Sequence, residues 1–94
     1  MTRKEISDLL ANTNKEFDYS AHEQLVHLTC VFENEDEEFE VTFAVPLYWT
    51  LEQTGFNTWG RLQHWLQNEY TSDDSKAILD TAILENKIAF WKIN

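Results

Sequence analysis

The chain is poor in the residues that interrupt or cross-link a fold. Its 94 residues include two glycines, one proline and one cysteine. A single cysteine, Cys30, excludes an intrachain disulfide and a cysteine-based metal cluster, and we expect a buried, inert thiol. Gly55 and Gly60 are too few for a phosphate-binding loop. The chain also lacks an N-terminal signal-like stretch and any long apolar run, which favours a cytoplasmic protein, including the cytoplasm of an infected host.

Positive charge is missing from nearly half of the chain. From Glu16 to Gly60 there are ten acidic residues and no Lys or Arg, and this region supplies the whole net charge of −10 because the flanks nearly cancel. Such a potential attracts cationic partners and repels nucleic acid and anionic lipid. A domain selected only for solubility intersperses both signs of charge. The asymmetry therefore favours a surface that binds a basic protein. The alternatives are an acid-rich composition typical of a halophilic source, or chance. Direct binding to nucleic acid or to a membrane is not expected.

The apolar content is sufficient for a folded core. The sequence is 43% hydrophobic and 14% aromatic, whereas a disordered chain combines high charge with few apolar groups. A chain of this size is expected to form one domain over 1–94. Its stability should be roughly 5–14 kcal/mol, at about 0.05–0.15 kcal/mol per residue.

Two segments alternate between apolar and polar residues, as half-buried strands do. In 24–33 the residues on one face are Val26, Leu28, Cys30 and Phe32, and in 39–45 they are Phe39, Val41, Phe43 and Val45. The polar segment 34–37 between them reads as a turn, and Pro46 should end the second strand because it has no N–H to donate. The pattern predicts an antiparallel hairpin over 24–45.

The remaining elements follow from helical spacing and from the last apolar segment. Helices are predicted over 3–11, 58–70 and 73–84, the last with a possible end near residue 80, and a strand over 87–93 with Ile88 and Phe90 on one face. In 58–70 the apolar stripe holds Trp59, Leu62, Leu66 and Tyr70. Residues 46–56 read as an aromatic linker. The predicted fold is α+β: a three-stranded, mostly antiparallel sheet covered by two or three helices. The sequence does not show on which side of the hairpin the last strand pairs.

No motif with a known catalytic mechanism is present. His22, His27 and His64 are read as surface histidines, and His27 with Cys30 is not a catalytic pair because residues three apart on a strand point to opposite faces. The acidic run 33–40 lacks the glycine and the oxygen spacing of a calcium loop. The sequence therefore predicts a protein that is not an enzyme and has no cofactor and no metal site.

Partner binding is predicted on the acidic run together with aromatic anchors. Charge supplies association rate and specificity, while tight binding also needs buried aromatic contacts. Four Trp are many to bury completely, and Trp65 is the first choice for a partly exposed one. The predicted partner-binding residues are Glu33, Glu35, Asp36, Glu37, Glu38, Glu40, Trp49, Trp65, Asp73 and Asp74.

Two modes of binding fit an acidic surface: mimicry of nucleic acid, and capping of a basic active site. Same-face strand residues are about 6.6 Å apart, whereas duplex DNA carries one charge per roughly 1.7 Å of axis, so one hairpin needs further carboxylates to mimic a duplex. In size, acidity and lack of catalytic motifs the chain resembles phage-encoded inhibitors of host nucleases and bacterial immunity proteins. The alternatives are a self-associating structural or assembly protein and a small ligand-binding domain. The sequence is compatible with a monomer and with a homodimer.

Overall fold

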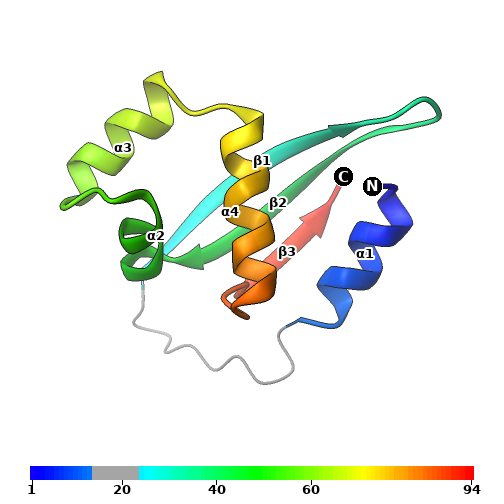
Figure 1. The fold of residues 1–94 in the computed structure, drawn as a ribbon, viewed down its shortest axis with the longest axis horizontal. Helices are drawn as coiled ribbons and strands as arrows, with labels where there is room; N and C mark the ends of the chain where they lie inside the picture. The colour runs from blue at the N-terminus through cyan, green and yellow to red at the C-terminus, as the bar shows by residue number, and fades with distance from the viewer. Residues whose placement is uncertain (14–23) are drawn as a thin grey trace.

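The computed structural model describes residues 1–13 and 24–94, which form an α+β fold (Figure 1). The elements in chain order are α1 (Arg3–Ala11), β1 (Leu25–Glu33), β2 (Glu38–Pro46), α2 (Leu47–Thr54), α3 (Trp59–Asn68), α4 (Ser72–Leu84) and β3 (Phe90–Ile93). The three strands form one antiparallel sheet in the order β1-β2-β3, so the C-terminal strand pairs with β2. The predicted fold class is confirmed.

The hairpin forms where alternation predicted it, and Pro46 ends β2. The antiparallel register places Leu28 opposite Phe43 and Cys30 opposite Val41. All four of these side chains are buried, at 3% exposure or less. Because partners in an antiparallel pair project to the same side of the sheet, one face of the hairpin is apolar and carries the core.

The helices of the described part of the chain lie on that apolar face (Figure 1). Ile6 and Leu10 of α1 and Leu79 of α4 are at most 1% exposed and join the strand residues in one cluster. The two-layer arrangement gives a thin molecule, with extents of 40 × 33 × 18 Å. The opposite face of the sheet carries no described helix. Within residues 1–13 and 24–94, no helix has both the length and the apolar character needed to cross a membrane.

The segment predicted as a linker, 46–56, contains a helix. Pro46 has φ −61° and ψ 138°, which places it in extended conformation at the N-cap of α2. Gly55 adopts φ 78° at the other end and donates its N–H to the Leu51 carbonyl, as a left-handed C-cap does. The short helix buries Trp49 and Thr50. Of the aromatic residues in the segment, Trp49 is buried, Tyr48 is 50% exposed and Phe56 follows the helix.

Three further predictions need correction. Trp59 was expected in the buried stripe of α3, but it occupies the first helical position and is 45% exposed, because only Leu62 of this helix is fully covered. The helix α4 continues to Leu84, so an end near residue 80 is excluded. In the last strand Ile88 is buried but Phe90 is 49% exposed, because the regular strand begins only at Phe90, on the face without helices.

The outer edge of β1 is partly covered by the start of α4. The Ser72 hydroxyl accepts from the Val31 N–H and lies equally close to the Val31 carbonyl, at 3.3 Å in both cases. An unpaired edge strand is a template for pairing with another chain. A side chain that occupies the backbone groups of Val31 counts against edge-to-edge self-association at this position.

Candidate protein-binding surface

The tip of the hairpin is held in one conformation by Asn34. Its backbone N–H donates to the Glu37 carbonyl at 3.0 Å. Its side-chain oxygen accepts from the backbone N–H groups of Asp36 and Glu37, each at 3.1 Å. This is the local bonding that makes Asn favourable in turns. The predicted turn over 34–37 is thus confirmed, and it is built by one amide side chain.

Acidic side chains crowd this end of the sheet. We use the name acidic hairpin surface for five exposed residues: Glu33, Glu35, Asp36, Glu38 and Glu40. The hairpin extends past the helical layer, so its tip stands away from α2, α3 and α4 (Figure 1). Glu33 lies directly opposite Glu38 in the register. With Glu40 two residues along β2, three carboxylates share the face of the sheet that carries no described helix.

Glu37 has a different role from the other acids of the run. Its Oε1 accepts from the backbone N–H of Arg3 at 2.7 Å and from the Asn34 side-chain amide at 3.4 Å. Arg3 is the first residue of α1, where unpaired N–H groups and the helix dipole favour a negative charge. Glu37 is therefore half-buried and is bonded to the start of α1, whereas the other acids of the run are exposed.

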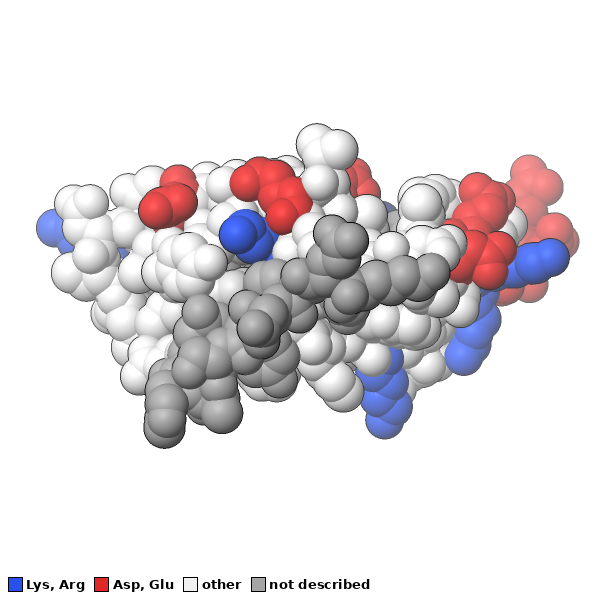
Figure 2. Space-filling model, turned by 90° about the horizontal axis from the view of Figure 1, so that it is seen from below, with Lys and Arg blue, Asp and Glu red and all other residues white. Residues whose placement is uncertain are grey.

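Acidic residues also lie away from the hairpin. Figure 2 shows acidic side chains along the helical side of the molecule as well as at the hairpin end, where Lys or Arg side chains stand next to them. Near the turn end of the hairpin, the Lys76 ammonium lies 5.1 Å from the ring centroid of Phe32, which pairs with Phe39 next to Glu33 and Glu38. The density of acids, rather than the absence of bases, distinguishes the hairpin end.

The predicted acids of α4 lie beside β1 and away from the tip. Asp73 is exposed in the first turn of the helix. Asp74 closes a capping box, because its Oδ2 accepts from the Thr71 N–H at 3.0 Å and the Thr71 hydroxyl at 2.9 Å. Ser72 connects this turn to Val31 of β1. Asp73 is therefore an exposed acid at the start of α4, while Asp74 is engaged in starting the helix.

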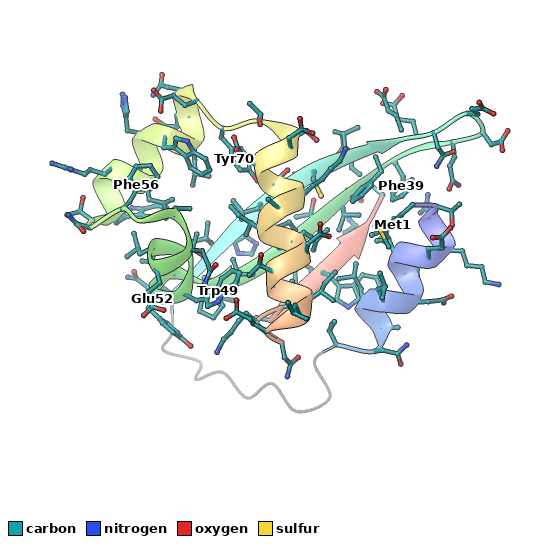
Figure 3. The ribbon with its side chains drawn as sticks, viewed as in Figure 1. Met1, Phe39, Trp49, Glu52, Phe56 and Tyr70 are labelled. Atoms are coloured by element: carbon teal, nitrogen blue, oxygen red, sulfur yellow. The ribbon has the colours of Figure 1, made fainter. Side chains whose placement is uncertain are left out.

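The predicted aromatic anchors divide into a buried residue and a half-buried one. Trp49 is 2% exposed, and its Nε1 donates to Glu85 at 3.3 Å. It is therefore a core residue, and its prediction as a surface anchor is corrected; Figure 3 shows it between α2 and α4. Trp65 is half-buried and packs against Phe56 and Tyr70. The large exposed indole is that of Trp59, which the helical wheel had placed inside.

Trp65 and Asp74 line one cavity of about 260 Å³ between the end of α2, α3 and α4. The other described lining residues include Phe56 and Ala77. Sequence reasoning singled out both Trp65 and Asp74 but gave no sign that they meet. Their meeting depends on how α3 docks beside α4.

Among the described residues, the thiol is buried and the described histidines are exposed. Burial raises the pKa of the Cys30 thiol to about 11, so the thiolate is scarce at neutral pH. His27 and His64 are exposed, on β1 and α3; His22 lies outside the described residues. In residues 1–13 and 24–94, no group of three or more His, Cys, Asp or Glu side chains could hold a metal ion.

The Tyr70 hydroxyl is a buried polar atom that has no hydrogen-bond partner among residues 1–13 and 24–94. Burial raises the pKa of Tyr70 to about 12, and the nearby Ser75 hydroxyl opposes that rise in part. Ser75 donates its own proton to the Ser72 carbonyl at 2.8 Å. The two hydroxyls are not in hydrogen-bonding geometry.

We expect Tyr70→Phe to raise the free energy of unfolding by about 1 kcal/mol, because an unpaired buried polar group costs roughly 1–3 kcal/mol. The ring that contacts Trp65 is kept. Urea unfolding measures the effect. The matched control is Tyr48→Phe at a side chain that is 50% exposed, with an expected change within about 0.5 kcal/mol. A loss of stability in Tyr70→Phe would show that the hydroxyl has a partner.

The chain has no match among the known proteins with which it was compared. No family model matches the chain, and neither a curated protein nor a solved structure matches it. The function is therefore inferred from the chemistry of the residues and their arrangement.

Proposed function

We propose that this protein binds a basic partner protein through the acidic hairpin surface, as an inhibitor does when it covers a nuclease site or a nucleic-acid-binding site. The main support is the pairing of Glu33 with Glu38 across the hairpin. Like charges directly opposite each other destabilise a sheet. With Glu40 on the same face, the fold keeps three carboxylates where they repel. A cationic partner would turn that repulsion into attraction.

The dimensions of the surface favour a compact basic site as the target. Glu38 and Glu40 are two residues apart on β2, a separation of about 6.6 Å. The cross-strand neighbour Glu33 adds a third carboxylate at a Cβ separation of about 5 Å. A duplex presents charges every roughly 1.7 Å over a much longer path. Capping of a local cluster of Lys and Arg side chains fits this spacing better than mimicry of a long duplex.

The surface is also preorganised. Asn34 fixes the turn, and Glu37 ties it to the first backbone N–H of α1. Ordering a flexible loop at an interface costs binding free energy. Because the tip is already ordered, less of the favourable electrostatic contribution to the binding free energy is lost. This supports the hairpin as the docking element.

The experiment is a capture of partners from the source cell with the protein as bait, at about 0.05 M and 0.5 M NaCl, with identification by mass spectrometry. We expect a protein with a basic surface that is held at low salt and released at high salt, because exposed charges are screened within about 10 Å at 0.1 M. The captured protein is then purified and its binding measured directly. A partner without a basic surface, or binding that is insensitive to salt, would overturn the proposal.

A further inference from the structure

The cavity beside α4 has aromatic walls and an acidic wall. Phe56 comes from the connection after α2, Trp65 from α3, and Asp74 and Ala77 from the first half of α4. Figure 3 shows Tyr70 between α3 and α4, and Phe56 beside α3. Three separate segments therefore build a single recess on the side away from the acidic hairpin surface.

The aromatic wall is held in place by mutual packing. The ring centroids of Phe56 and Trp65 are 5.6 Å apart at an interplanar angle of 45°. Tyr70 meets Trp65 on another side, at 5.3 Å and 71°. Such tilted contacts are the favoured arrangements of aromatic pairs. The Trp65 indole is thus positioned by two neighbours before any ligand arrives.

The acidic wall is fixed as well. The Oδ2 atom of Asp74 accepts two hydrogen bonds from Thr71, which orients the carboxylate. A carboxylate offers about four acceptor positions, so capacity remains for a donor in the cavity. Of the described residues that line the cavity, none is Lys or Arg. The recess therefore has a negative charge next to a π surface.

We propose that this cavity receives an arginine side chain from a part of the basic partner that extends past the hairpin onto the helical side of the molecule. A guanidinium is planar, stacks on aromatic rings and binds carboxylates through several N–H donors. Its aliphatic stem suits the apolar part of the wall, which includes Ile78. The volume of about 260 Å³ is sufficient, since an apolar cavity of about 150 Å³ admits benzene. This inference rests on the proposed function for the source of the arginine.

The test uses a small probe, so that it does not depend on finding the partner. Blocked arginine, N-acetyl-arginine methylamide, is titrated into the ¹⁵N-labelled protein at low salt and followed by NMR. We expect saturable shifts of the Trp65 indole N–H and of the backbone N–H groups of residues 54–56 and 74–78. Blocked citrulline, which is neutral and nearly isosteric, should bind at least about tenfold more weakly.

Ala77→Leu is the decisive variant, because Ala77 is exposed on α4 and the larger side chain fills the cavity without entering the core. We expect it to weaken arginine binding at least about tenfold, while Ala11→Leu, the same change on α1, leaves binding unchanged. Equal shifts with citrulline, or unchanged binding by Ala77→Leu, would overturn the inference. A variant with reversed hairpin charges that no longer binds the partner, but still shows these shifts with blocked arginine, would support the arginine cavity. It would also show that the cavity and the hairpin surface can be tested separately.

Discussion

Replacing Trp49 with alanine is expected to lower the free energy of unfolding by about 3–5 kcal/mol, which is the range for large aromatic side chains in cores. Trp49 is 2% exposed and contacts the core cluster. The variant also removes the donor to Glu85. If the total stability lies at the lower end of the expected range of roughly 5–14 kcal/mol, such a loss brings the protein close to unfolding at 37 °C.

Urea unfolding of three variants measures this effect. Trp49→Phe keeps most of the ring volume and should lose less than the alanine variant. Trp59→Ala removes the same side chain from a position that is 45% exposed, and its expected change is within about 1 kcal/mol. Equal losses in Trp49→Ala and Trp59→Ala would contradict the assignment of Trp49 to the core.

Reversing three charges of the acidic hairpin surface is expected to abolish electrostatic steering of the partner. In the variant with Glu35→Lys, Asp36→Lys and Glu38→Lys, we expect the association rate at low salt to fall about 100-fold, within the range of 10–1,000 for charge steering. Glu37 is left intact because it caps α1. The change at Glu38 also converts its pairing with Glu33 into opposite charges, so stability should not fall.

The matched control reverses three exposed acids elsewhere, with Glu52→Lys, Glu69→Lys and Asp80→Lys. Glu52 lies at the end of the molecule away from the hairpin tip (Figure 3). The net charge changes equally in both variants, so a difference in rate reports the position of the charges. Stopped-flow mixing with the captured partner measures the rates. A control variant that slows binding as much as the hairpin variant would show that net charge alone steers association.

The hairpin could be predicted because a single period dominates its sequence. Leu28, Cys30, Val41 and Phe43 alternate without interruption, and one buried face fixes the register strongly. The helix α2 was missed for the opposite reason. It is eight residues long, too short for a clear helical period, and its aromatic residues are equally common in strands.

The candidate site was less predictable because it depends on contacts between distant segments. The bond between Glu37 and Arg3 joins residues 34 apart, and no local pattern signals it. A helical wheel shows which face of the helix a residue occupies, but not whether another element covers that turn. For this reason the wheel predicted a buried Trp59, whereas the residue is exposed. Sequence pointed to Trp65 and to Asp74 separately; their shared cavity comes from the docking of α3 and α4.

Both ends of the described chain converge beside the hairpin turn (Figure 1). The Met1 carbonyl accepts from Asn34 at 3.5 Å, and the Arg3 guanidinium donates to the Asn94 carbonyl at 3.5 Å. Any polypeptide fused at either terminus, whether an affinity tag, a fluorescent reporter or a neighbouring module, therefore emerges next to the turn. A polyhistidine tag placed there would shield the carboxylates sterically.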